Sequence, residues 1–158
     1  MKKIQKLNKS SVKLFLELIH FEGNHFLHFK KNGWSDQQVR QQFKKEINFS
    51  IGVFKDNLLI AFILGDLIYV EKNTEYEILI IYVKNNYRKQ GLATKLLNYL
   101  EKQKKVLKLK KIYLEVAKIN KKAIFFYEKN NYKLINIRAK YYSIDNKKID
   151  AFCYSKIL

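Results

Sequence analysis

The hydrophobic pattern of the N-terminal part of the chain predicts one short strand and two helices. Residues 2–7 are the strand candidate. A helix follows, capped by Ser10 or Ser11, because apolar residues recur three or four positions apart on one face, at Val12, Phe15, Leu16 and Ile19. A second helix is predicted from Ser35, with Trp34 before the cap as a hydrophobic staple.

From residue 48 onwards, alternating apolar residues predict an antiparallel meander. The stretch 48–70 divides into two strands at the turn Lys55-Asp56-Asn57, and residues 75–83 form a third strand. Strands and helices then alternate: helix 91–104, strand 110–116, helix 120–130, and two final strands around Asp145-Asn146. A strand–helix–strand succession requires some parallel pairing. The predicted fold class is therefore α/β, with a mixed, mostly antiparallel central sheet flanked by about four helices.

Length and composition indicate one folded domain over residues 1–158. A hydrophobic fraction of 47% with 15% aromatic residues argues against disorder, despite a formal net charge of +18. Only Arg40, Arg88 and Arg138 of the 32 basic residues are arginine, the type that bidentate phosphate binders favour. We therefore expect a solvated lysine surface without a specific nucleic-acid site. Weak electrostatic attraction to RNA or ribosomes is the alternative reading of the charge.

The remaining composition bears on compartment and metals. A lone cysteine, Cys153, forms no internal disulfide, which predicts a reducing, cytoplasmic setting. No segment approaches the roughly 20 apolar residues that a membrane span needs, so no membrane partner is expected. His20, His25 and His28 lack cysteines or acidic residues at ligand spacing, which favours surface or peptide-groove roles over a metal site.

The junction after the strand at 77–83 is a candidate anion site. Residues 88–94 form the first turn of a helix, where free N–H groups and the helix dipole attract anions. Arg88 and Lys89 add positive charge, and Gly91 and Ala93 allow a diphosphate to approach the backbone. An ordinary basic helix start with a glycine turn has the same pattern, so this motif alone leaves both readings open.

Further along the chain the pattern becomes more specific. A strand followed by Arg88, Gly91 and Ala93 resembles the acetyl-CoA signature [Q/R]xxGx[G/A] of the GNAT superfamily. LEVAKINKKAIFFYEKNNYKLINIRAKYY at 114–142 is similar to the second conserved block of the bacterial RimI group of ribosomal-protein-alanine N-acetyltransferases. GWSDQQV at 33–39 resembles that group's PWS segment, with Gly33 in place of proline. The positions that depart from the group's pattern are Ile80, Ala117 and Ile149.

The resemblance implies acetyl-CoA as co-substrate and a set of residues that bind it. The backbone of Ile81, Tyr82 and Val83 would hold the pantetheine arm, and Asn120 would hydrogen-bond that arm. The pyrophosphate would be bound by Arg88 and by the helix start, comprising Lys89, Gln90, Gly91, Leu92, Ala93 and Thr94. No metal is implied.

The resemblance also implies catalytic and substrate-binding residues. Glu115 would be the general base and Tyr127 the general acid, and Tyr141 and Tyr142 would clasp the backbone of a peptide substrate. An α-amine with a pKa of about 7.7–8.0 needs little help to lose its proton near neutral pH, whereas lysine at about 10.4 needs more, so one carboxylate acting through water suffices for an N-terminus. The structural alternatives are a salt-bridged strand residue for Glu115, a core aromatic for Tyr127 and stacked sheet aromatics for the tyrosine pair.

These observations predict a cytoplasmic N-acetyltransferase that modifies the N-terminal α-amine of a protein. A ribosomal protein with N-terminal alanine is the candidate substrate, attacked directly in a ternary complex with acetyl-CoA. Two other readings remain open: acetylation of an internal lysine or a small-molecule amine, and a non-catalytic basic module that binds RNA or ribosomes.

Overall fold

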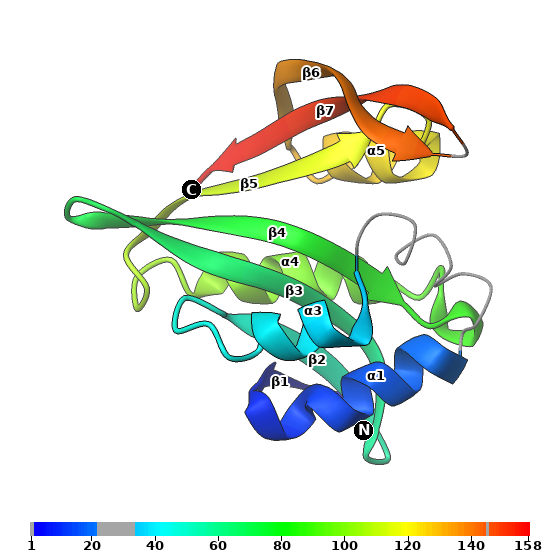
Figure 1. The fold of residues 1–158 in the computed structure, drawn as a ribbon. Coiled ribbons are helices and arrows are strands. Elements are labelled where there is room, and N and C mark those ends of the chain that lie inside the picture. Colours follow the sequence, from blue (N-terminus) through cyan, green and yellow to red (C-terminus); the bar gives the residue numbers. More distant parts are fainter. Residues whose placement is uncertain (1, 22–33, 145) are drawn as a thin grey trace.

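The computed structural model describes residues 2–21, 34–144 and 146–158 (Figure 1). Its centre is a seven-stranded sheet in the order β1-β2-β3-β4-β5-β7-β6. The strands are β1 Lys3–Leu7, β2 Ser50–Lys55, β3 Leu58–Val70, β4 Asn73–Val83, β5 Leu109–Ala117, β6 Lys133–Ile144 and β7 Lys147–Ile157. The α-helices of the described residues are α1 Val12–Phe21, α3 Asp36–Gln42, α4 Leu92–Lys102 and α5 Lys121–Lys129.

Parallel pairing in this sheet is confined, among the described strands, to β4 and β5. The predicted α/β fold with a mixed, mostly antiparallel sheet and four helices is therefore confirmed. The predicted hairpin turn between β2 and β3 also forms, with positive φ angles at Asp56 and Asn57 that suit a tight hairpin turn. Within the described residues, none of the helices combines the length and apolar character needed to cross a membrane.

The start of α1 differs from the prediction, because neither serine is the N-cap. Asn8 occupies that position in an extended conformation, and its Oδ1 accepts the N–H of Ser10 at 3.0 Å. Ser11 Oγ accepts the N–H of Asn8 in return, at 3.1 Å. A 3-10 turn over Lys9–Ser11 then leads into α1, so both serines already belong to the turn that Asn8 caps.

The second helix begins as predicted. Ser35 is the N-cap of α3, with its Oγ accepting the N–H of Gln38 and its own N–H donating to Gln38 Oε1. Trp34 precedes the cap and packs against the same hydrophobic cluster as Val39, the fourth residue after the cap, as expected of a staple. Gly33, the predicted replacement for proline, lies outside the described residues.

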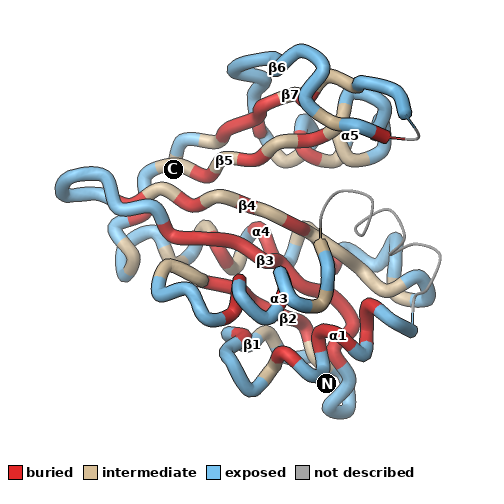
Figure 2. Tube along the Cα trace, in the orientation of Figure 1, coloured by how far each residue is buried: buried red, intermediate tan, exposed pale blue. Residues whose placement is uncertain are grey.

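The two faces of the sheet carry separate hydrophobic cores because alternate side chains of a strand point to opposite faces. Helices α1 and α3 cover one face and α4 and α5 the other (Figure 1). The α1 side buries Phe15, Phe62 and Leu64, whereas the α4 side buries Leu97 and Leu114. Figure 2 shows burial concentrated in β3, while β6 at the sheet edge is mostly exposed.

The middle of the sheet opens where β4 and β5 stop pairing. Their register runs from Thr74–Leu109 to Ile78–Leu114 and ends there. At the same level Leu79 is an extra residue of β4 relative to β3, a bulge that bends the strand. Beyond this level β4 pairs only with β3, and β5 only with β7, among the described strands, and Figure 1 shows the two strands diverging. Beyond this level the backbone groups on the facing edges take no part in pairing between β4 and β5.

Candidate active site

A pocket of about 570 Å³ lies at this opening, between the end of β4 and the first turns of α4 and α5. Its lining contains every residue predicted to bind the cofactor except Gln90, together with Tyr127. The lining residues are Ile81, Tyr82, Val83, Tyr87, Arg88, Lys89, Gly91, Leu92, Ala93, Thr94, Asn120, Lys122, Ala123, Phe126 and Tyr127. The structure therefore gathers residues of β4, α4 and α5 around one hollow.

The start of α4 presents backbone donors to this pocket. Gly91 is the N-cap residue in the left-handed region (φ 72°), and a Cβ there would meet no described atom within 4 Å beyond its chain neighbours and the backbone of its own helix. Among the described residues, no main-chain hydrogen bond outside helices and strands has its donor at positions 89–94. The first N–H groups of a helix also have no partner within the helix. Together with the side-chain cations of Arg88, Lys89 and Lys122, these donors form a site suited to a diphosphate.

Two side chains near the helix start are held by the protein itself. Arg88 Nε donates to the carbonyl of Val83 at 3.0 Å, and the guanidinium lies 5.6 Å from the ring centroid of Tyr82. Gln90 donates to the carbonyl of Asn86 at 3.3 Å and accepts from Lys2 Nζ at 2.7 Å. These bonds hold the Gln90 side chain away from the pocket. If Gln90 contacts the cofactor as predicted, the contact is made by its backbone N–H.

Helix α5 brings Asn120 and Tyr127 to the opposite wall of the pocket. Asn120 is the N-cap, with Oδ1 accepting the N–H of Ala123 at 3.2 Å. Positions 120, 123 and 127 share one helix face, which explains why all three line the hollow. Tyr127 is 5% exposed, and its phenol oxygen has no hydrogen-bond partner within the described part of the chain. Burial raises the pKa of Tyr127, and nearby Tyr142 raises it further.

Glu115 lies on the other face of the sheet from Tyr127. Its neighbours Leu114 and Val116 belong to the α4-side core, so strand alternation turns Glu115 toward the α1 side. Its Oε1 accepts from Tyr113 Oη at 2.7 Å and from Arg138 Nη1 at 2.7 Å. The Glu115 side chain is 13% exposed. Glu115 is thus a salt-bridged strand residue, as the structural alternative predicted. Its carboxylate can nevertheless accept further hydrogen bonds, because both of these bonds involve Oε1.

Only Oε2 of the Glu115 carboxylate is left to accept a further hydrogen bond from outside the described residues. The thiol of Cys153, at 3.8 Å, is also directed to Oε1, so Glu115 Oε2 has no partner among the described residues. The paired residues Glu115 and Cys153 share the α1-side face of the sheet. Glu115 therefore combines one occupied oxygen, which fixes the carboxylate, with one oxygen that can still accept a proton.

The predicted substrate residues Tyr141 and Tyr142 surround this carboxylate. Their ring centroids lie 5.1 Å apart in an edge-to-face arrangement, and the guanidinium of Arg138 lies 3.8 Å from the Tyr141 centroid. Burial and then the charge of Glu115 raise the pKa of Tyr142 to about 12, partly offset by Arg138. Since Tyr142 also acts on the pKa of Tyr127, it lies within electrostatic range of both predicted catalytic residues. The two faces of the site thus meet at the opening between β4 and β5.

The sequence model of the acetyltransferase (GNAT) family matches residues 8–132, which contain β4, the start of α4, β5 and α5. The chain belongs to the GNAT family of acetyltransferases. A search of curated protein sequences finds no match. Acetyl-CoA is the typical co-substrate of GNAT acetyltransferases.

Solved structures show the same GNAT fold over nearly the whole chain. The Escherichia coli ribosomal-protein-S18-alanine N-acetyltransferase is 23% identical with a TM-score of 0.80, covering 99% of this chain and 94% of its own. Arabidopsis thaliana NAA60 in complex with acetyl-CoA is 18% identical with a TM-score of 0.79, covering 100% and 99%. An N-acetyltransferase from Staphylococcus aureus Mu50 is 16% identical with a TM-score of 0.77, covering 99% and 97%. At these identities the likeness concerns the fold.

Some residues of this GNAT site were not found from the sequence. Tyr87, Lys122, Ala123 and Phe126 line the pocket without having been predicted. Helical spacing from Asn120 would have indicated Ala123, which lies three residues further on. No local signal distinguishes Arg138 as the partner of Glu115, because the two residues are 23 positions apart and meet through β7.

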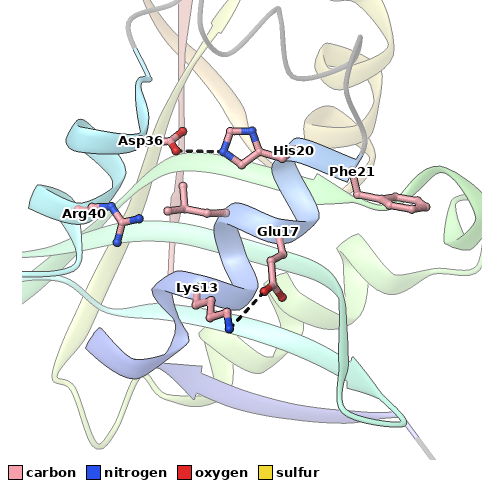
Figure 3. A pocket seen from close by; sticks show the side chains of 7 residues that line it. Lys13, Glu17, His20, Phe21, Asp36 and Arg40 are labelled. Carbon is pink, nitrogen blue, oxygen red and sulfur yellow. Dashed lines mark hydrogen bonds and ion pairs between the residues drawn. The ribbon is translucent and has the colours of Figure 1, made fainter.

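A second hollow, of about 790 Å³, lies between α1 and α3, and its described lining contains His20 but none of the predicted site residues (Figure 3). His20 Nε2 is 3.0 Å from Asp36 Oδ2, which places the imidazole at the surface, as the sequence favoured. The described residues contain no cluster of three or more His, Cys, Asp or Glu side chains suited to a metal. His25 and His28 lie outside the described residues.

Proposed function

We propose that this GNAT acetyltransferase transfers the acetyl group of acetyl-CoA to the N-terminal α-amine of a protein, with a ribosomal protein bearing N-terminal alanine as the candidate substrate. The observation that carries the proposal is the division of the site between the two faces of the sheet. A pocket with phosphate-binding features lies on the α4 side, and a carboxylate ringed by tyrosines lies on the α1 side. Both open at the divergence of β4 and β5.

The pocket residues fit acetyl-CoA. The free N–H groups at the start of α4 and the cations of Arg88, Lys89 and Lys122 match a diphosphate in charge and in donor capacity. Pairing of β4 with β5 ends at Ile78 and Leu114 among the described strands, so the edge of β4 beyond this level is where the amides of the pantetheine arm can add like a strand. When bound, acetyl-CoA supplies an electrophilic thioester carbonyl and a thiolate leaving group.

Glu115 is the proposed general base. Tyr113 and Arg138 hold Oε1 from two directions, so the carboxylate is fixed before substrate arrives. Oε2 faces no described partner and can accept the amine proton directly or through one water. A near-neutral α-amine needs only this modest assistance, because its pKa of about 7.7–8.0 leaves a sizeable neutral fraction at pH 7.

Tyr127 is the proposed general acid. Its phenol lines the cofactor pocket without a protein partner among the described residues, so its proton is available to a group bound there. Burial raises the pKa of Tyr127, which keeps the hydroxyl protonated throughout the neutral range. A protonated donor at this wall suits the departing thiolate.

The choice of an N-terminal amine rests on the α1 face. Tyr141 and Tyr142 stand beside Glu115 in an edge-to-face pair, an arrangement that can enclose the first backbone units of a peptide. The Escherichia coli structure with the same fold is a ribosomal-protein-S18-alanine N-acetyltransferase, which supports the alanine N-terminus as first candidate. The +18 net charge would favour encounter with an acidic ribosome surface.

The test is mass spectrometry of an N-terminal alanine peptide incubated with acetyl-CoA and the full chain. We expect α-acetylation by the wild type, and a fall in kcat of about 10²–10⁴-fold in Tyr127→Phe and in Glu115→Gln. Tyr127→Phe should retain its melting temperature, because the phenol makes no described hydrogen bond. Undiminished turnover in both variants would contradict the assigned roles.

Substrate class is tested with a matched peptide panel. A peptide with a blocked N-terminus and an internal lysine, and a free small-molecule amine, should give no product under conditions where the free N-terminus is acetylated. Product from the blocked peptide would assign the enzyme to lysine acetylation instead. Absence of any thermal shift with acetyl-CoA, together with tight salt-dependent RNA binding, would favour the non-catalytic reading.

A further inference from the structure

Strand β6 contains a three-residue irregularity next to the predicted substrate tyrosines. Arg138 pairs with Ala151 of β7, and Tyr142 pairs with Ile149. Three residues of β6 therefore stand opposite the single residue Asp150. The bulge shortens the separation of Arg138 and Tyr142 along the sheet, because their partners are only two residues apart.

The shortening changes what can touch Glu115. In a regular strand four residues span about 13 Å, whereas two partner residues span about 7 Å. Arg138 and Tyr142 thus occupy neighbouring positions on the same sheet face as Cys153, which pairs with Glu115. Tyr141 fills the bulge between them, with its ring against the Arg138 guanidinium. Without the bulge, Tyr142 would lie two residues further from Glu115.

Asp150 supplies the bond that holds the bulge. Its Oδ1 accepts the backbone N–H of Lys140, the central residue, at 3.0 Å. Lys140 has a φ of 53°, a left-handed conformation that a lysine adopts only when its surroundings impose it. The backbone carbonyl of Asp150 accepts the N–H of Lys118 at 3.0 Å. The N–H of Lys140 is therefore bound by the Asp150 side chain and not by a backbone carbonyl of β7.

The same aspartate ties the bulge to the end of β5. Asp150 Oδ2 accepts from Lys118 Nζ at 3.3 Å, in addition to the backbone bond from Lys118. Lys118 follows β5 directly, three residues after Glu115 and two before Asn120. The hydrogen bonds from Lys140 and Lys118 lower the pKa of Asp150, which keeps the carboxylate ionised at neutral pH. One side chain thus connects the segment of the base to the segment of the tyrosines.

We propose that Asp150 is a positioning residue for peptide binding, which holds the β6 bulge so that Tyr141 and Tyr142 stand beside Glu115. The inference rests on the proposed function in that the tyrosine pair binds a peptide. The role of Asp150 is limited to the peptide that accepts the acetyl group. Asp150 does not line the pocket proposed for acetyl-CoA, so we expect acetyl-CoA binding to be independent of it.

The test compares Asp150→Ala and Asp150→Asn in steady-state kinetics with an alanine N-terminal peptide. Asp150→Ala should raise KM for the peptide about tenfold or more and leave KM for acetyl-CoA unchanged, because misplacement of a positioning group by about 1 Å is enough for such losses. Asp150→Asn keeps an oxygen acceptor for the Lys140 N–H and should recover most of the peptide affinity. Lys148→Ala, an exposed change on the same strand, is the matched control and should behave as wild type.

A structural readout accompanies the kinetics. Amide hydrogen exchange over residues 139–142 should be faster in Asp150→Ala and close to wild type in Asp150→Asn, at an unchanged thermal shift with acetyl-CoA. An unaltered peptide KM in Asp150→Ala, or an equal rise in KM for acetyl-CoA, would overturn the inference while the wild-type activity upholds the proposed function. Wild type that acetylates no N-terminal peptide would overturn the proposed function, and the peptide role of Asp150 with it.

Discussion

Arg138 Nη1 donates to Glu115 Oε1 at 2.7 Å while its guanidinium lies 3.8 Å from the centroid of Tyr141. One arginine thus contacts both the proposed base and a proposed substrate-binding ring. The hydrogen bond to Glu115 is also the main cause of the raised pKa of Arg138. Planar guanidinium groups combine hydrogen bonding in their plane with stacking across it, which lysine cannot do.

Replacement of Arg138 should therefore impair the reaction more than the fold. Arg138→Lys keeps the charge but loses the planar contact with Tyr141, and should lower kcat/KM for the peptide about tenfold, with Arg138→Ala lower still. The melting temperature of Arg138→Lys should change little, because lysine keeps the positive charge beside Glu115. Arg40→Lys, in α3, is the control and should retain full activity. Equal activity of the wild type and Arg138→Ala would show that Glu115 needs no such support.

Raising the pH to about 10 should not deprotonate Tyr127, the proposed general acid. Burial raises the pKa of Tyr127, so the folded enzyme keeps this phenol protonated beyond the ordinary tyrosine value of 10.0. We expect kcat to show no downward limb from a tyrosine as the pH rises to about 10. The measurement is a pH–rate profile at saturating acetyl-CoA and peptide. A descending limb near pH 10 that is absent in Tyr127→Phe would assign an unperturbed phenol to this position.

The raised pKa of Glu77 predicts that Glu77→Gln and the wild type differ in stability by an amount that depends on pH. Burial raises its pKa above the ordinary value of 4.5, and the charges of Glu115 and Asp66 raise it further against an opposing effect of Lys45. The free energy of unfolding is therefore highest, as far as Glu77 is concerned, below pH 4.5, where the side chain is protonated in both states. It falls as the pH rises through the folded-state pKa, because the folded state must then hold a buried charge. Glu77→Gln should accordingly melt at a higher temperature than wild type at pH 7, with the difference vanishing at about pH 4 and below.

The neighbouring carboxylate provides the control for Glu77. Glu75, two residues earlier on β4, pairs with Lys111 Nζ at 3.2 Å. Glu75→Gln loses an ion pair and should show no gain in melting temperature at pH 7. A Glu77→Gln protein that is less stable than wild type at pH 7 would indicate that Glu77 has a favourable partner in solution.

Gly91→Ala should weaken cofactor binding and stability together. An alanine at φ 72° costs about 1–2 kcal/mol because of its left-handed conformation. The new methyl group would project into open space at the pocket lining, because a Cβ there meets no described side chain within 4 Å beyond its chain neighbours. We expect KM for acetyl-CoA to rise about tenfold while KM for the peptide stays within twofold, since loss of close backbone approach affects only the diphosphate.

A turn residue far from the pocket separates the two effects of Gly91→Ala. Asn57, between β2 and β3, has a φ of 63°, and Asn57→Ala imposes a similar backbone strain. Asn57→Ala should lose stability as Gly91→Ala does and keep the wild-type KM for acetyl-CoA. If both variants raise this KM equally, the effect reflects general destabilisation and the diphosphate role of Gly91 is wrong.

The sequence by itself determined the secondary-structure elements and the segment proposed to bind the cofactor. Strands and helices could be predicted because their periods of two and 3.6 residues are local properties, and the four predicted helices and the mixed sheet are present. The candidate cofactor residues at 81–83 and 88–94 are nearly contiguous, so a short motif contains them. The exception was the start of α1, where Asn8, and not Ser10 or Ser11, caps the 3-10 turn that leads into the helix.

Tertiary structure alone decided how the two sides of the site are joined. The opposite faces of Glu115 and Tyr127, the ion pair with Arg138 and the links of Asp150 to Lys118 and Lys140 depend on strand register. Register is set by packing between segments far apart in the chain, since a slip of one residue exchanges the two faces of a strand. The local sequence does not specify such pairings, which is why candidate residues could be named from the sequence but their partners in the fold could not.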